Sequence, residues 1–325
     1  MIEVKTLNKS FKVAKRDPGL FSAFKSLIHP QFTEVKALEN ISFNISEGEI
    51  VGYIGPNGAG KSTTIKVMSG VLVPDSGTCS ILGKTPWANR VEHVKNIGVV
   101  FGQRSQLWWD VPVIDSFHLL KDIYKIPLLT FNDMLELLCT TLNLSALLKT
   151  PVRQLSLGQR MRCEIAASLL HSPKILFLDE PTIGLDAVSK IAVRNFIKTL
   201  NSEKKTTVIL TTHDMSDIEA LADRILLIGK GKLLLDGTLK QLKEKYVTHK
   251  ILIADYHDYH GQIHLEGTEV LESTHNRLKL KIDLSKRNVS DIISQLNTKL
   301  DIIDLTIEDR AIDEIIVDLY KEFEI

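Results

Sequence analysis

The sequence has few cysteines and no long apolar run. Three cysteines in 325 residues are too few and too widely spaced for a disulfide framework or a zinc site. No stretch approaches the roughly 18 consecutive apolar residues of a membrane-spanning helix, and the first residues contain no apolar signal segment. We therefore expect a chain of a reducing compartment that needs another chain to anchor it if it works at a membrane.

Net charge is also absent. The 40 basic side chains balance 40 acidic ones, and no local basic patch stands out. This balance removes the electrostatic attraction that dominates non-specific binding to nucleic acids, so we expect no nucleic-acid partner. Hydrophobic residues make up 44% and charged residues 25% of the chain, which excludes a disordered, collagen-like or coiled-coil protein.

From Ile41 onward, short apolar runs alternate with longer segments of helical period. This pattern is typical of an α/β fold with a largely parallel sheet. Successive Val, Ile and Leu residues indicate strands that are covered on both faces. The predicted strands are Ile50–Ile54, Ile97–Phe101, Ile175–Leu178, Thr207–Thr211 and Arg224–Ile228. A Gly-Lys-Gly-Lys turn at 229–232 then leads into 233–235 and predicts a hairpin that closes the sheet.

A change of composition near Tyr246 predicts a boundary between a domain over 1–245 and a small α+β domain over 246–325. The second domain is expected to contain strands at 278–284 and 302–307 and helices at 289–300 and 311–323. The apolar stripe of the last helix would pack on these strands or on a second subunit. The stretch after the boundary contains four histidines without the i, i+4 spacing of a helical metal site, which favours a polar loop: His249, His257, His260 and His264.

The most specific motif is G-x-x-x-x-G-K-[ST], placed between the first of these strands and a segment of helical period. Its glycines let backbone N–H groups converge on phosphates, while the Lys61 ammonium can reach the β/γ oxygens and the Ser62 hydroxyl can bind Mg²⁺. The motif consists of Gly55, Pro56, Asn57, Gly58, Ala59, Gly60, Lys61, Ser62 and Thr63. We therefore predict a P-loop NTPase.

A second motif is the apolar strand 175–178, which ends in Asp179 and Glu180. Asp179 is placed to hold Mg²⁺ through water, and Glu180 is the candidate base that orients the attacking water. An apolar strand that ends in two acids is weak evidence alone, but it becomes strong beside a phosphate-binding loop.

Together these motifs resemble the ATP-binding cassette (ABC) ATPases. Residues 155–159 read Leu-Ser-Leu-Gly-Gln, similar to the signature of that family. The resemblance implies that Ser156, Gly158 and Gln159 contact ATP held by the opposite subunit of a head-to-tail dimer. It also implies a helical signature subdomain over about 104–172, and roles for three further residues: Gln103 as the catalytic and Mg²⁺-binding glutamine of the Q-loop, Asp186 as the aspartate of the D-loop, and His213 as the switch histidine at the γ-phosphate.

Some features leave alternatives open. Leu157 stands where the family usually has glycine, for which we expect an altered backbone approach to the nucleotide. Phe11 fits the aromatic that stacks on adenine in the family, or it packs in the core. The tandem Trp108 and Trp109 lie where the family docks its membrane subunits, although burial in the helical subdomain is equally compatible.

An insertion at 14–34 also allows two interpretations. Residues 20–28 place four apolar side chains on one helical face, which would touch the membrane interface or dock on the protein itself: Leu20, Phe24, Leu27 and Ile28.

The resemblance implies the ATP-hydrolysing subunit of an ABC transporter, most similar to the ABC-2-type exporters. Its cofactors would be ATP and Mg²⁺, and its partners separately encoded transmembrane permease subunits and a second copy of itself or a similar ATPase subunit. It would lie on the cytoplasmic face of the membrane as a peripheral protein. The alternatives are a soluble cassette ATPase of DNA or ribosome metabolism and an importer ATPase. The former usually carries two cassettes, a long coiled coil or paired cysteines, which this sequence lacks.

Overall fold

The computed structural model describes residues 1–14, 32–102, 105–257, 259, 261 and 263–324. These residues form two compact units, 1–238 and 239–324, and each is described by itself. The division falls between Thr238 and Leu239, ahead of the boundary expected at Lys245. The reason is that the helix after Thr238 packs against the last helix of the second unit.

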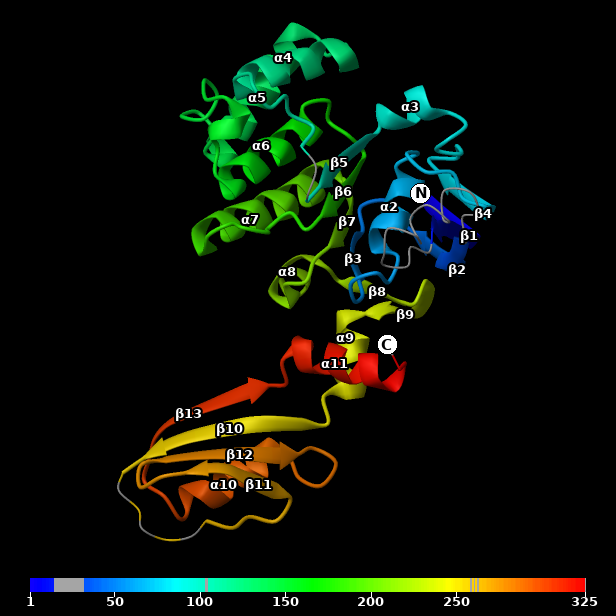
Figure 1. Cartoon of the computed structure of the whole chain (residues 1–325). Helices are drawn as coiled ribbons and strands as arrows, with labels where there is room; N and C mark the ends of the chain where they lie inside the picture. Colours follow the sequence, from blue (N-terminus) through cyan, green and yellow to red (C-terminus); the bar gives the residue numbers. More distant parts are fainter. Residues whose placement is uncertain (15–31, 103–104, 258, 260, 262, 325) are drawn as a thin grey trace, which may run out of the picture. The chain divides into compact units, whose positions relative to one another are not determined.

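The main sheet of the first unit has six strands in the order β5-β6-β7-β3-β8-β9 (Figure 1). They are β3 (Ile50–Ile54), β5 (Ile97–Phe101), β6 (Ile175–Asp179), β7 (Thr207–Thr211), β8 (Arg224–Gly229) and β9 (Lys232–Thr238). Neighbouring strands are parallel except for β9, which pairs with β8 in the antiparallel direction. The five predicted strands and the closing hairpin are confirmed. The apolar runs of the four inner strands are almost entirely buried, as strands covered on both faces require.

A second sheet of the first unit has three antiparallel strands in the order β2-β1-β4. They are β1 (Ile2–Ala14), β2 (Phe32–Ile45) and β4 (Ser76–Ile81). One apolar core joins this sheet to the main sheet, with Leu7 and Ile41 from the former and Tyr53 and Phe177 from the latter. The ends of the predicted insertion belong to the strands, since Ala14 pairs with Phe32. The predicted amphipathic helix lies outside the described residues.

The helices of the first unit include a group formed by α4, α5 and α6, within the range expected for the signature subdomain (Figure 1). The helices are α2 (Lys61–Met68), α3 (Arg90–Val94), α4 (Val113–Tyr124), α5 (Leu128–Leu142), the 3₁₀ turn η1 (Val152–Gln154), α6 (Leu157–Leu169), α7 (Ala187–Lys204) and α8 (Met215–Leu221). Trp108 and Trp109 precede this group and are 43% and 52% exposed, which contradicts their burial in the subdomain. Arg160 lies over the Trp109 ring, 5.8 Å from its centroid.

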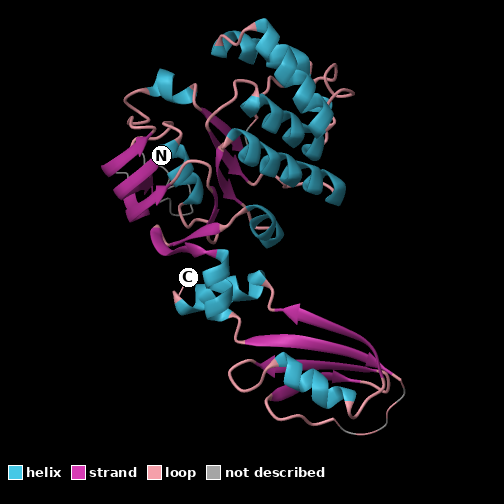
Figure 2. Cartoon of the chain, turned by 180° about the vertical axis from the view of Figure 1, so that it is seen from behind, coloured by secondary structure: helices cyan, strands magenta, loops and turns pink. Residues whose placement is uncertain are grey.

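The second unit contains a four-stranded antiparallel sheet in the order β11-β12-β10-β13, with a helix across one face (Figure 2). Its elements are α9 (Leu239–Tyr246), β10 (His249–Tyr256), β11 (Thr268–Ser273), β12 (Arg277–Asp283), α10 (Val289–Asn297), β13 (Ile302–Asp309) and α11 (Ile312–Glu322). Leu252 and Leu280 of the sheet share a buried core with Ile292 and Leu296 of α10.

The expected polar loop after residue 246 is wrong over 249–256, because this segment is β10, a central strand of the second sheet. Leu252, Ala254 and Tyr256 alternate toward the core, and this period of two was obscured by the histidine and lysine at the start of the strand. His257 and His264 lie outside the strands, and His260 lies outside the described residues. Within the described part of the chain, no three His, Cys, Asp or Glu side chains gather as metal ligands.

The apolar stripe of α11 is buried within its own unit, as its periodicity requires: Ile312, Ile315, Ile316 and Leu319. It packs against α9, whose Leu242 is buried, a neighbour that differs from the strands or second subunit expected from the sequence. The Tyr246 hydroxyl at the end of α9 donates a hydrogen bond of 3.0 Å to Glu322 of α11. Of the helices that the structure describes, none is both long and apolar enough to span a bilayer.

Candidate active site

The phosphate-binding loop connects β3 to α2, as the sequence predicts. Its last glycine, Gly60, has φ 110° and is the N-cap of α2. A side chain there would be strained, and its Cβ would lie 2.5 Å from the Ala37 carbonyl oxygen, so the position requires glycine. Among the described residues, no side chain caps the start of α2, so the first N–H groups of the helix are available at the loop.

Lys61, the first residue of α2, points into this loop. Its ammonium donates hydrogen bonds of 2.6 Å and 3.0 Å to the carbonyl oxygens of Gly55 and Pro56. Burial lowers the pKa of Lys61, and the nearby Glu180 and Asp179 carboxylates oppose this by raising it. A cation is therefore held at the loop with acidic groups close by.

Asp179 ends β6 beside the start of α2. One carboxylate oxygen, Oδ2, accepts a hydrogen bond of 3.3 Å from the Ser62 hydroxyl, and the other accepts from the hydroxyl of Thr211 at the end of β7. Because β6 and β7 are parallel neighbours, Asp179 and Thr211 lie opposite each other at the same sheet edge. Hydroxyl and carboxylate oxygens from two segments thus converge at one place.

Glu180 follows Asp179 and contacts His213. Its Oε1 lies 2.7 Å from His213 Nε2. The Glu180 backbone has φ 56°, a left-handed conformation that costs a residue other than glycine roughly 1–3 kcal/mol and persists only where neighbours fix it. Here the Glu180 N–H donates 2.9 Å to the Thr211 carbonyl oxygen, so the turn is anchored to β7.

These residues line one open cavity of about 420 Å³. The predicted residues in its lining are Asn57, Gly58, Gly60, Lys61, Ser62, Thr63, Asp179, Glu180 and His213. Gly55, Pro56 and Ala59 belong to the loop behind it, where Ala59 is buried. Sequence reasoning missed four further lining residues, Ala37, Lys66, Phe101 and Gly102. Phe101 and Gly102 lie at the end of β5, and Lys66 lies on α2 after the loop motif, so their positions in the sequence could have indicated them. Ala37 on β2 carries no such signal.

The signature residues are elsewhere, since none of them is among the described residues that line this cavity. Ser156 is the N-cap of α6, and its hydroxyl accepts a hydrogen bond of 3.2 Å from the Gln159 N–H. The Gln159 side chain in turn accepts 2.9 Å from the Ser156 N–H. The two motif residues thus form a capping box that fixes the start of the helix.

Leu157 fits at the signature because it faces a glycine. A Cβ on Gly184, which has φ 70°, would lie 2.4 Å from Leu157 Cδ2. Leu157 therefore occupies the space that a side chain at 184 would need. Gly158 faces the same loop, and a Cβ placed on it would lie 3.0 Å from the Gly184 carbonyl oxygen. The leucine at the start of α6 is thus accommodated by the glycine of the loop that follows β6.

Three other predicted residues have different outcomes. Asp186 is the N-cap of α7, where it accepts hydrogen bonds of 2.8 Å and 3.1 Å from the backbone and hydroxyl of Ser189. Hydrogen bonds from Ser189 lower the pKa of Asp186. Phe11, on β1, is 39% exposed, which argues against core packing, and it does not belong to the described cavity lining. Gln103 lies outside the described residues.

A phosphate-binding loop that faces an acidic strand end and a histidine across a parallel sheet defines a P-loop nucleotide-binding protein. A family model described as ABC transporter matches residues 38–183. The chain is 31% identical over 224 residues to Nod factor export ATP-binding protein I of Ralstonia nicotianae, a match that covers 69% of this chain and 68% of that protein. It therefore belongs to the ABC transporter family, among its ATP-binding proteins.

Other relatives are longer or solved as dimers. ABC transporter A family member 1 of Dictyostelium discoideum is 31% identical over 244 residues, which are 74% of this chain, and the chain spans only 27% of that relative. The dimeric post-hydrolysis ATP-binding cassette MJ0796, solved with ADP and Pi, is similar with a TM-score of 0.62 and 26% identity, covering 74% of this chain and 99% of that one. The cassette fold expected from the sequence is thereby confirmed.

Proposed function

We propose that this chain binds and hydrolyses ATP and so energises an ABC-2-type exporter whose membrane pathway is formed by separate permease subunits. The observation that carries the proposal is the cavity in which Lys61 and Ser62 face Asp179, Glu180 and His213. The relatives named above support transport, and neither is named for DNA or ribosome metabolism.

The loop is suited to the triphosphate. Gly58 and Gly60 bring backbone N–H groups to the cavity, and the uncapped N-terminus of α2 adds the positive end of a helix dipole. The Lys61 ammonium donates hydrogen bonds to carbonyl oxygens of the loop, and it can turn from them to the β/γ phosphate oxygens of ATP. These groups bind ATP without contacting its base.

The oxygen atoms of Ser62 and Asp179 fit Mg²⁺, which prefers hydroxyl, carboxylate and phosphate oxygens. Thr211 orients the Asp179 carboxylate by donating to Oδ1, while Ser62 donates to Oδ2. When bound, Mg²⁺ would neutralise charge on the β and γ phosphates. Gln103 remains a candidate ligand on the resemblance alone.

Glu180 is the proposed base. It lies beyond Asp179 at the cavity wall, where its carboxylate can accept a proton from water and direct that water at the γ-phosphate. His213, 2.7 Å from Glu180 Oε1, can hold this carboxylate and contact the γ-phosphate from its other side. Hydrolysis would then proceed by in-line attack of water, with the Lys61 ammonium stabilising the charge that develops on the phosphate oxygens.

We propose that two such subunits close head to tail on two nucleotides. Ser156, Gly158 and Gln159 are not among the described residues that line the cavity of their own chain, which supports a site that the opposite subunit completes. The Ser156 hydroxyl accepts from Gln159 and still has a proton to donate to a phosphate oxygen. Asp186 would lie at the same interface, and the dimer of the related MJ0796 cassette supports this arrangement.

The proposed permease contact is the exposed Trp108 and Trp109 before α4. Large exposed aromatics are typical anchors of protein interfaces. Docking there would hold the chain at the cytoplasmic face of the membrane, without a span of its own. The exporter assignment is supported by the relative that acts in Nod factor export.

The test is Glu180→Gln, which keeps the shape of the side chain and removes the carboxylate. We expect ATP hydrolysis to fall by about two to four orders of magnitude, with ATP affinity retained and an ATP-dependent dimer accumulating. The matched control is Glu136→Gln, which removes the same charge from an exposed position of α5. Wild-type turnover in the Glu180 variant would contradict the proposal.

A further inference from the structure

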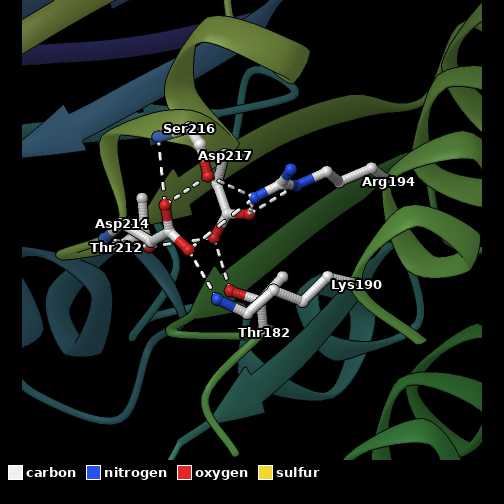
Figure 3. Close-up of polar contacts among 7 residues, drawn as sticks. All are labelled: Thr182, Lys190, Arg194, Thr212, Asp214, Ser216 and Asp217. Atoms are coloured by element: carbon white, nitrogen blue, oxygen red, sulfur yellow. Dashed lines mark hydrogen bonds and ion pairs between the residues drawn. The ribbon is translucent and has the colours of Figure 1, made fainter. Parts of the chain in front are cut away.

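A fully buried carboxylate lies behind the active site. Asp217 on α8 is 0% exposed, and its partners come from three segments (Figure 3). Thr182 follows β6, Arg194 is on α7, and Thr212 follows β7. Burying a charge costs several kcal/mol unless it is paired and hydrogen-bonded, so such a group needs a reason to be there.

The partners satisfy both oxygens of Asp217. Oδ1 accepts a hydrogen bond of 2.6 Å from Arg194 Nε. Oδ2 accepts one of 3.0 Å from the Thr212 hydroxyl and another from the Thr182 hydroxyl. One carboxylate thus binds three donors that are distant in the sequence.

A second set of contacts reinforces the first (Figure 3). Lys190 of α7 donates 2.6 Å to Asp214 Oδ2, and Arg194 donates 2.7 Å to the Ser216 hydroxyl. Asp214 also caps α8 by accepting 3.0 Å from the Ser216 N–H. Two residues of α7, Lys190 and Arg194, therefore connect this helix to the segment that follows β7.

The positions of the two threonines relate this network to the site. Thr182 lies two residues after Glu180, and Thr212 lies immediately before His213. Both hydroxyls donate to the same atom of Asp217, so the two loops share one fixed point. Glu180 and His213, which these loops carry, meet 2.7 Å apart. None of the network residues drawn in Figure 3 lines the described cavity.

We propose that Asp217 is a positioning residue, which holds the Glu180 loop and the His213 loop in register for ATP hydrolysis without touching the nucleotide. The inference rests on the roles proposed for Glu180 and His213. A buried ion pair is weak evidence for stability, because apolar groups of similar volume often serve as well. Fixing the relative position of two loops requires a group that can bond to both, which a carboxylate with four lone-pair sites does.

The test removes one hydroxyl at a time, since Val has the shape of Thr. We expect Thr182→Val and Thr212→Val each to lower kcat roughly 10-fold, because small displacements of reacting groups are costly, and to leave the Kd for ATP within about twofold. Thr182→Ser, which keeps the hydroxyl, should restore kcat. Asp217→Asn should lower kcat at least as much as either valine variant.

The matched control is Thr207→Val, at the opposite end of β7. Thr207 is buried, and its hydroxyl accepts a hydrogen bond of 2.9 Å from the Gly48 N–H, away from the active site. This variant should lower Tm and leave kcat unchanged. If Asp217→Asn fails to fold, the two threonine variants decide the matter.

Two results would overturn the inference. The first is wild-type kcat in both threonine variants with a Tm loss like that of Thr207→Val, which would make the network a structural support only. The second is an equal loss of ATP affinity and kcat, which would assign the network to nucleotide binding. In either case an inactive Glu180→Gln would show that the proposed base stands, whereas an active one would show that the function proposed for Glu180 has failed.

Discussion

The two units of the chain place their polar side chains in different ways. In the first unit, parallel strands end at one sheet edge, so Asp179 of β6 and Thr211 of β7 meet there with the loops that follow. In the second unit, neighbouring antiparallel strands pair polar side chains across the sheet, as in Lys250–Asp309 and Lys281–Glu269, at 2.8 Å and 3.6 Å. Parallel strands therefore concentrate chemistry at one end, while antiparallel strands distribute it over a face.

The largest effect that tests this difference is expected when one lysine from each unit is replaced. Lys61→Ala should weaken ATP binding by about 10–100-fold, the effect of losing hydrogen bonds from a charged group. Lys250→Ala in β10 removes a lysine that is paired with Asp309 at 2.8 Å, and it should leave ATP affinity unchanged. Titration with a fluorescent ATP analogue measures the affinity of both variants. An equal loss of ATP affinity in the two would contradict the proposed difference between the units.

An intermediate effect is expected from two histidines. His171 stacks on the Tyr124 ring at 4.0 Å, and its Nε2 donates 2.9 Å to the Ile97 carbonyl oxygen. Burial lowers the pKa of His171, with the bond to Ile97 opposing this. As the pH falls below about 6.5, His171 therefore gains a proton in the unfolded chain but not in the folded chain. The free energy of unfolding consequently decreases on acidification.

His171→Gln should accordingly flatten the dependence of Tm on pH between about 7.5 and 5.5. The difference in Tm between these two pH values should shrink by about 2–4 °C, which corresponds to roughly 1 kcal/mol of unfolding free energy in a domain of this size. His249 of β10 is only half-buried. Its pKa is lowered mainly by burial and, to a smaller extent, by the charges of Lys281 and Arg310. His249→Gln should change the slope less, as calorimetry at several pH values would show. A larger effect at His249 would contradict the expectation.

The smallest effect is expected from removing the second unit. A chain that ends at Thr238 retains every described residue that lines the cavity, so its affinity for Mg-ATP should stay within about twofold of that of the full chain. Equilibrium titration and the mass in solution should be measured together, since the second unit is expected to support dimerisation or coupling to the permease. An insoluble product, or one that does not bind ATP, would show that the first unit depends on the second.

The central sheet and the phosphate-binding loop could be predicted because their signals are local. Each parallel strand of the main sheet is built on an apolar run, and the loop motif has fixed spacing between β3 and α2. Lys61, Asp179, Glu180 and His213 were predicted on the same grounds or by resemblance, and the structure brings them to one cavity. Their catalytic roles remain proposals.

The rest could not be predicted because it depends on contacts distant in the sequence. β10 begins with polar residues and was interpreted as a loop, although pairing with β12 and β13 makes it central. Asp217 lies among ordinary helix residues, and only the fold brings Thr182 and Arg194 to it. Ala37 lines the cavity because β2 passes beside the loop, which no residue pattern indicates.

The contact between Leu157 and Gly184 restricts the order in which this chain can change over evolutionary time. A mutation that places a side chain at 184 meets Leu157 at once, and the positive φ of Gly184 adds strain. A mutation of Leu157 to a smaller residue meets no such obstacle. The order in which position 157 becomes smaller first therefore costs less than the reverse, because a side chain placed at 184 beside an unchanged Leu157 has to displace the leucine side chain.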